Sequence, residues 1–320
     1  MILKEKIAQQ LPDFRARVTK LVKEHGEIIL DKVTIGQVYG GMRDIKSLVT
    51  DISFVDPATG IKFRGMTIPE LLKKLPKPRG NKIPYVGGLY YLLMIGEVPT
   101  REQAEEVEGE WAKRSQVPDY VYKILKSMPR ETHPMVLFSQ AVLALQNQSE
   151  FARKYNEGIK KDVYWESTLE DALNLTAKLP LIAAFIYRMK YYGDTRKPKY
   201  NLRQDYGSNF ARMMGVEDRK GYAELARLYF ILHSDHESGN VSAHATHLVG
   251  SALSDVYYAF SAGLNGLAGP LHGLANQECL GWLINVKDKF NGVPKREELY
   301  QFAWDTLNGG KVIPGYGHAV

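Results

Sequence analysis

Apolar residues recur at intervals of three and four along most of this chain, the spacing that gathers them on one face of an α-helix. Three of these runs open with a Thr or Ser followed three positions later by Glu or Gln, at residues 67–70, 100–103 and 167–170. This pattern is a capping box, in which two side chains bind the unpaired backbone N–H groups of a helix start. We therefore predict a mainly α-helical fold with helices that begin at these three places.

The alternating pattern of a β-strand is confined to the N-terminal segment 51–65, DISFVDPATGIKFRG. Its middle, from Asp56 to Gly60, is rich in residues that favour turns, so the segment predicts one small β-hairpin. No series of alternating strands and helices follows it, which excludes a Rossmann-type core.

The length of 320 residues and the balanced composition indicate a globular protein of about two domains. The longest apolar run, residues 179–187, is far shorter than the roughly 20 residues that a membrane span needs. We expect a buried helix segment there and no membrane contact. The net charge of +6 comes from Lys and Arg that are mixed with acids rather than clustered, so nucleic acid is not expected as a partner.

Cysteine usage and the first residues bear on the compartment. The single cysteine, Cys279, excludes an intramolecular disulfide and a thiolate metal cluster, which suits a reducing environment. Acidic and basic residues are mixed from the start of the chain, which argues against a secretory signal or an Arg-rich transit sequence. We expect a cytoplasmic protein, with a processed protein of the mitochondrial matrix as the alternative.

Three histidines lie on turns rich in glycine or other small residues. They are His236 in HSDHESGNVSAH, His272 in GLAGPLHGLANQE and His318 in PGYGHAV. Glycine lets a backbone approach a ligand closely, and imidazole donates or accepts a proton near neutral pH. These turns predict an acid/base site for carbonyl chemistry. Asp235 and Glu237, on either side of His236, are interpreted as capping or ion-pair groups.

The same strings, with GNVSAH, VYGGMRD and AKLPLIAA in the same order, resemble the citrate synthases of mitochondria and some bacteria. The resemblance extends over essentially the whole chain. It implies a two-domain fold, with a large helical domain at 1–274 and the start of a small domain at 275–320. It also implies an acyltransferase that condenses acetyl-CoA with oxaloacetate and water to give citrate and CoA.

The resemblance assigns roles to individual residues. His272 corresponds to the histidine that binds the acetyl thioester carbonyl and stabilises its enol, and His318 to the one that donates to the keto oxygen of oxaloacetate. His236 and, more weakly, Asn240 and Ser242 of the same turn correspond to positions at the oxaloacetate site. The positions that correspond to coenzyme A contacts are Arg43, Lys161, Val312, Ile313, Gly315 and Tyr316. Coenzyme A is then a co-substrate, with no permanently bound cofactor and no metal, and a homodimer is expected.

Three alternatives stay open on the sequence. A 2-methylcitrate synthase would use propionyl-CoA in a related site. A helical scaffold or ligand-binding protein would keep the coenzyme A surface without chemistry. A histidine metalloprotein is the third, because His233 and His236, like His244 and His247, are three positions apart.

In citrate synthases, the segment after PGYGHA carries the aspartate that removes the methyl proton and arginines that bind oxaloacetate. These 320 residues end at Val320, before such a segment. We therefore expect the 320 residues alone to lack the general base and to form no appreciable citrate in a turnover assay with acetyl-CoA and oxaloacetate. Citrate formation at ordinary enzyme rates would contradict this expectation.

Overall fold

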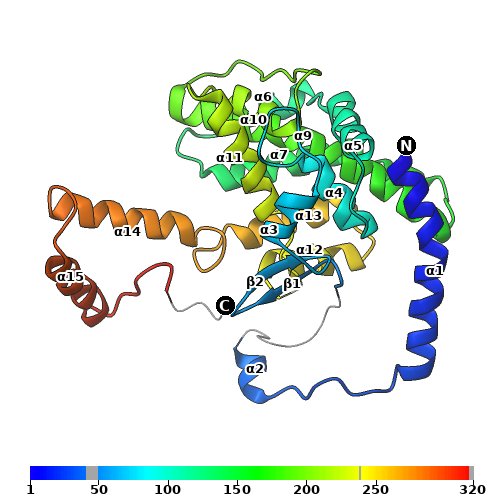
Figure 1. The fold of residues 1–320 in the computed structure, drawn as a ribbon, viewed down its shortest axis with the longest axis horizontal. Coiled ribbons are helices and arrows are strands. Elements are labelled where there is room, and N and C mark those ends of the chain that lie inside the picture. The colour runs from blue at the N-terminus through cyan, green and yellow to red at the C-terminus, as the bar shows by residue number, and fades with distance from the viewer. Residues whose placement is uncertain (41–49, 238, 317–320) are drawn as a thin grey trace.

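Helices dominate this computed structural model, which describes residues 1–40, 50–237 and 239–316 (Figure 1). The elements up to residue 163 are α1 (Ile2–His25), α2 (Ile35–Tyr39), β1 (Ser53–Asp56), β2 (Gly60–Phe63), β3 (Met66–Thr67), α3 (Ile68–Lys74), α4 (Val86–Ile95), α5 (Arg101–Arg114), α6 (Asp119–Ser127), α7 (Pro134–Leu145), η1 (Gln146–Gln148), α8 (Glu150–Asn156) and η2 (Lys161–Val163). They are followed by α9 (Tyr164–Tyr192), α10 (Tyr206–Met214), α11 (Arg219–Leu232), α12 (Val241–Ser251), α13 (Val256–Leu267), α14 (Ala275–Lys289) and α15 (Arg296–Asn308). The prediction of a mainly α-helical fold is confirmed.

Two of the three predicted helix starts are confirmed. Capping boxes at 67–70 and 100–103 open α3 and α5. The third prediction is wrong, because α9 begins at Tyr164 and Ser167 lies inside it. The Ser167 hydroxyl donates to the Tyr164 carbonyl at 3.1 Å, so this serine binds the preceding turn of its own helix instead of capping a new one.

The predicted hairpin is confirmed and is one strand larger than expected. β1 and β2 pair antiparallel with Ser53 opposite Phe63, and Gly60 at the turn has φ +82°, a conformation that favours glycine. β3 adds to the other edge of β2. Its two residues are too few to show an alternating pattern, so the sequence did not reveal it.

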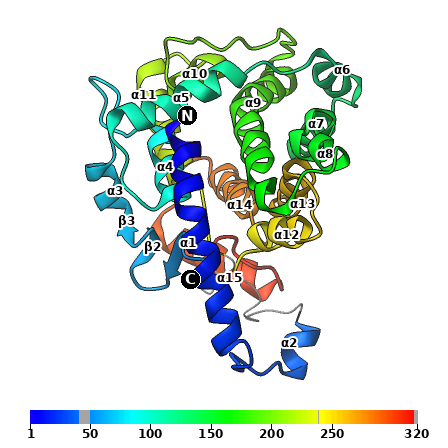
Figure 2. The same ribbon diagram turned by 90° about the vertical axis from the view of Figure 1, so that its right-hand side faces the viewer.

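Helix α9 runs through the middle of the helical body, between α4 and α5 on one side and α6, α7 and α8 on the other (Figure 2). The apolar run 179–187 lies in this helix, and Ile182, Ala184 and Phe185 are fully buried. The expected buried helix segment is therefore confirmed. No helix in the described ranges combines the length and the apolar character that a membrane span requires.

Pro180 lies inside α9, where a proline has no N–H for the carbonyl four residues earlier. That carbonyl belongs to Thr176, and the buried Tyr206 of α10 donates its hydroxyl proton to it at 2.8 Å. The tyrosine thus replaces the missing helix hydrogen bond and attaches α10 to α9.

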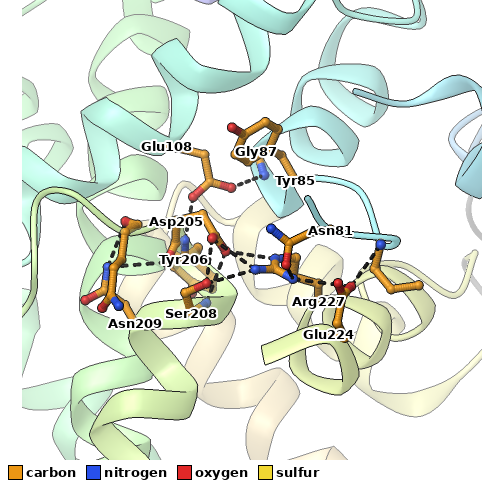
Figure 3. Close-up of polar contacts among 12 residues, drawn as sticks. Asn81, Tyr85, Gly87, Glu108, Asp205, Tyr206, Ser208, Asn209, Glu224 and Arg227 are labelled. Atoms are coloured by element: carbon orange, nitrogen blue, oxygen red, sulfur yellow. Dashed lines mark hydrogen bonds and ion pairs between the residues drawn. The ribbon is translucent and has the colours of Figure 1, made fainter. Parts of the chain in front are cut away.

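Glu108 of α5 is a buried carboxylate that accepts hydrogen bonds from the N-terminal ends of two other helices (Figure 3). Its Oε1 accepts from the backbone N–H of Gly87, in the first turn of α4, at 2.9 Å. Its Oε2 accepts from Tyr206, the first residue of α10, at 2.7 Å. A Cβ on Gly87 would lie 2.9 Å from the Ala104 carbonyl oxygen, so only glycine allows α4 to approach α5 this closely.

A second buried polar cluster fixes α11 against α10. Asp205 caps α10 and accepts from the Arg227 guanidinium at 2.9 and 3.1 Å (Figure 3). Glu224 lies 3.3 Å from the same guanidinium. Burial of Arg227 is thus matched by two carboxylates, as a buried charge requires.

Helices α14 and α15 extend away from the helical body in Figure 1. They contact one another through aromatic rings, with the centroids of Trp282 and Phe302 5.4 Å apart. The expected domain boundary after residue 274 falls at the start of α14 and stays a prediction.

Burial raises the pKa of Glu108 to about 7, although the N–H groups of Gly87 and Tyr206 act in the opposite direction. Because the folded chain then binds this proton more tightly than the unfolded chain, stability decreases as the pH rises from the usual value of 4.5 to about 7. The decrease is about 3 kcal/mol from this group.

Glu108→Gln removes this titration and leaves one of the two N–H groups without an acceptor. We expect the variant to be less stable at pH 5, with the difference from the parent narrowing by about 3 kcal/mol towards pH 8. Urea unfolding across this pH range measures the difference. A constant difference would contradict the raised pKa.

Candidate functional site

The turn that carries His236 is attached to β1 on both sides of the histidine. The Ser53 hydroxyl donates to the Asp235 carboxylate and accepts from the Glu237 backbone N–H at 2.7 Å. The Glu237 carboxylate accepts from the Val55 N–H at 3.5 Å. Both acids therefore bind the sheet and do not cap a helix, which corrects the interpretation from the sequence. Glu237 has φ +40°, so the backbone turns sharply directly after His236, whose side chain is exposed.

Asn240 ends this turn and begins α12. Its Oδ1 accepts from the Ala243 N–H at 2.9 Å, the bond of an N-cap, and its Nδ2 donates to the His236 carbonyl at 2.6 Å. One side chain thus fixes the helix start and the histidine turn together. These two bonds also determine which end of the amide is oxygen.

His272 contacts the same structure from a distant part of the chain. Its Nε2 lies 2.9 Å from the Ser242 hydroxyl, and that hydroxyl lies 2.6 Å from Asn240 Oδ1. A chain of hydrogen bonds therefore connects the backbone of His236 to the ring of His272 through Asn240 and Ser242. The structure brings these two predicted histidine turns together.

Close packing of α12 on α13 makes this connection possible. A Cβ on Gly263 of α13 would lie 2.2 Å from the Thr246 hydroxyl and 3.0 Å from the Ser242 carbonyl. A Cβ on Gly266 would lie 2.9 Å from Val241. Because neither position has room for a side chain, the two helices approach near Ser242, and the turn that follows α13 reaches it.

The turn itself is compact. The His272 N–H donates to the Gly269 carbonyl at 3.0 Å, and the Ala275 N–H to the His272 carbonyl at 3.1 Å. A Cβ on Gly273 would lie 2.3 Å from the Leu267 carbonyl oxygen, so glycine is needed directly after the histidine. Helix α14 begins three residues after His272.

The loop after α15 returns to α14. Gly315 has φ +91°, and a Cβ built on it would lie 3.6 Å from Cys279 Sγ. The Tyr316 N–H donates to the Ile313 carbonyl at 3.3 Å, while the side chains of Val312 and Tyr316 are exposed. Residues 312–316 therefore lie beside the helix that follows His272, and Gly315 is exposed as well.

Several predicted site residues are not assembled here. Arg43 and His318 lie outside the described residues. Lys161 is exposed at the start of η2, where the backbone carbonyl of the next residue, Asp162, accepts from the Arg15 side chain of α1 at 3.0 Å. The functional roles of all the predicted site residues stay predictions.

The arrangement of the histidines bears on the metalloprotein alternative. Within the described ranges, no group of three or more His, Cys, Asp or Glu side chains is arranged to hold an ion. His233 and His236 do not share a helix, because α11 ends at Leu232. The His233 ring stacks on that of Tyr229, with centroids 4.1 Å apart.

Ser53 and the role of Ser242 as the link to His272 were not predicted. Ser53 lies 184 positions from Glu237, whose N–H donates to its hydroxyl, and Ser242 lies 30 positions from His272. Ser53 has no sequence signal, whereas Ser242 follows Asn240 in the same small-residue turn. Its place in that turn made Ser242 a candidate site residue, but the sequence did not indicate that it contacts His272.

Comparison with known proteins agrees with the turn motifs. Residues 41–320 match the family model described as citrate synthase, C-terminal domain. The chain is 48% identical over 318 residues to the mitochondrial citrate synthase of Saccharomyces cerevisiae, covering 99% of this chain and 66% of that protein. It is 46% identical over 318 residues to the mitochondrial 2-methylcitrate synthase of Yarrowia lipolytica, covering 99% and 68%.

The fold agrees as well. The crystal structure of citrate synthase from Pyrobaculum aerophilum superposes with a TM-score of 0.75 at 26% identity, covering 92% of this chain and 71% of that one. The chain spans about two thirds of the length of these relatives.

Replacing Gly263 with alanine tests the contact that positions Ser242. We expect Gly263→Ala to lower the free energy of unfolding by about 1–3 kcal/mol, because the new methyl group overlaps Thr246 and the Ser242 carbonyl. Urea unfolding measures the change.

Gly109→Ala is the matched control, because Gly109 lies inside α5 with open space at its Cβ position. We expect it to raise stability by about 0.5–1 kcal/mol through helix propensity alone. Equal effects of the two substitutions would show that α12 and α13 are not in close contact.

Proposed function

We propose, from the premise that this chain belongs to the citrate synthase family, that its histidine turns serve the condensation of acetyl-CoA with oxaloacetate and water. The products are citrate and CoA. The observation that carries the proposal is the chain of hydrogen bonds from His236 through Asn240 and Ser242 to His272. It joins a candidate keto-acid site to a candidate thioester site.

The acetyl methyl group must lose a proton before it attacks a ketone, and negative charge then develops on the thioester oxygen. A positioned donor stabilises that oxygen. His272 is suited to this task because Ser242 binds its Nε2 and the turn from Gly269 to Ala275 holds its backbone. The ring would donate from Nδ1 to the thioester carbonyl.

Ser242 determines whether Nδ1 carries the proton. Its hydroxyl has one proton and two acceptors within reach, Asn240 Oδ1 and His272 Nε2. In the structure the serine proton is directed to Asn240 Oδ1, and the proposed step requires it to turn to His272 instead. Asn240 Oδ1 keeps a donor in that case, because it also accepts from the Ala243 N–H. A neutral imidazole that accepts at Nε2 carries its proton on Nδ1, as the proposed donor requires.

Oxaloacetate would bind at the His236 turn, where the side chain of His236 is exposed and Asn240 fixes the end of the turn. His318, which follows the loop 312–316, would donate to the keto oxygen. Its proposed role rests on the motif PGYGHAV.

Coenzyme A would bind along the same loop. The backbone of Val312, Ile313, Gly315 and Tyr316 would contact the adenine ring, and Gly315 lies next to α14. Arg43 and Lys161 are proposed phosphate contacts. In this scheme coenzyme A enters as a co-substrate and no group is permanently bound.

The assembly and compartment are also proposals. Gly263 and Gly266 pack α13 on α12 within one chain, so the proposed homodimer rests on family membership. The name of the mitochondrial relative from Saccharomyces cerevisiae favours the mitochondrial matrix over the cytoplasm.

The 46% identity to the 2-methylcitrate synthase of Yarrowia lipolytica supports a second candidate, which uses propionyl-CoA. We expect the natural polypeptide that contains these residues to release CoA from acetyl-CoA with a kcat/KM at least tenfold that for propionyl-CoA, since one methylene changes binding by about 1–3 kcal/mol. Release of the thiol in the presence of oxaloacetate measures both rates. A preference for propionyl-CoA would favour the second candidate, and no release with either would refute both.

Substitutions at the two linked residues test their roles. We expect His272→Ala to lower kcat roughly 1000-fold, because the developing enol oxygen loses its donor. Ser242→Ala should lower kcat about tenfold, the effect of one net hydrogen bond. Gly109 lies far from these residues in sequence, so Gly109→Ala should leave kcat unchanged. If His272→Ala retains the parent kcat, the assignment is wrong.

A further inference from the structure

A cavity of about 250 Å³ lies where α10, the start of α11 and the loop before α4 meet. Neither histidine turn contributes to its wall. Four cations line it, and no carboxylate is among the described residues of its lining. The cations are Arg212, Arg219, Lys220 and Arg227.

The spacing of these residues explains why they converge. Ser208 and Arg212 are four positions apart and share a face of α10. Lys220 and Arg227 are seven apart and share a face of α11. The two helices pack against each other, with Arg219 also in the first turn of α11, so the cations of both helices border the same space.

Only one of the four charges is compensated within the described chain. Arg227 pairs with Asp205 and Glu224. Arg212 donates to uncharged oxygens, those of Gln204 and Asn209, each at 3.1 Å, and of the Lys199 carbonyl.

The two cations at the start of α11 have no ion pair among the described residues. The adjacent acid, Asp218, uses its carboxylate to accept from the Gly221 N–H at 2.8 Å, as the cap of α11. Burial lowers the pKa of Arg212, and the charge of Arg219 lowers it further. Like charges thus face one another across a hollow, an arrangement that a bound anion would relieve.

We propose that this cavity binds a small oxyanion with two or more negative charges, such as a diphosphate group. Three cations without a carboxylate partner supply the charge, and the Arg219 guanidinium supplies planar donors that suit phosphate oxygens. The volume is several times the roughly 30 Å³ of a water molecule, enough for a diphosphate but not for a whole nucleotide cofactor. The site is separate from the proposed condensation site and does not depend on it.

Calorimetric titration of the natural polypeptide with inorganic pyrophosphate, at constant ionic strength, tests the proposal. We expect saturable binding that Arg219→Gln with Lys220→Gln weakens about tenfold or more, through the loss of two charged donors. Both side chains are exposed and outside the core, so the fold should survive, as thermal unfolding would verify. Orthophosphate, which carries less charge, should bind more weakly.

The matched control is Lys20→Gln with Lys23→Gln, which removes the same charge from exposed positions on α1. It should leave the affinity unchanged. Equal weakening in both double variants would indicate only general charge attraction and overturn the proposal, as would a lack of pyrophosphate binding by the parent.

Coenzyme A carries a diphosphate of its own, so saturating CoA distinguishes the two sites. We expect CoA not to displace pyrophosphate, and His272→Ala to bind it with parental affinity. Displacement by CoA would place the pyrophosphate at the proposed coenzyme A site and overturn the proposed anion site. The proposed condensation activity would not be affected by that result.

Discussion

The buried carboxylate of Glu108 joins the N-terminal ends of α4 and α10, and the structure around the candidate site depends on this junction. A helix end in a core leaves N–H groups that must find acceptors, and its dipole favours a negative charge. One carboxylate on α5 meets both needs. With α10 fixed, Asp205 at its start holds Arg227 of α11, and α11 leads directly into the turn of His236.

The two histidine turns are positioned by different kinds of contact. Hydrogen bonds from Ser53 hold the His236 turn to the sheet, and steric fit between α12 and α13 brings the His272 turn within reach of Ser242. The hydrogen bonds fix the orientation of the His236 turn, whereas the glycine contacts fix the distance between α12 and α13. A hydrogen-bonded link between the two histidine turns needs both, because an imidazole must be close to its partner and aligned with it.

Two buried polar groups, the Thr176 carbonyl and the Arg227 guanidinium, are satisfied by side chains of other residues. Tyr206 supplies the hydrogen bond that Pro180 cannot, and Arg227 has two carboxylates. The cavity beside α10 and α11 differs, because Arg212, Arg219 and Lys220 border one hollow and have no carboxylate partner in the described chain. Cations that line a cavity and have no carboxylate partner are a reason to test for a bound anion.

The sequence by itself determined the helical class, the hairpin, the burial of residues 179–187 and, through the turn motifs, the family. These properties follow from local spacing and from strings of neighbouring residues, which a sequence displays directly. Only the tertiary structure decided that α9 begins before Ser167, that Ser53 holds both neighbours of His236, and that Ser242 joins His272 to Asn240. Such contacts join residues 30 to 184 positions apart. A hydroxyl or carboxylate can bind many partners, and the packing of helices selects the one that comes within hydrogen-bonding distance.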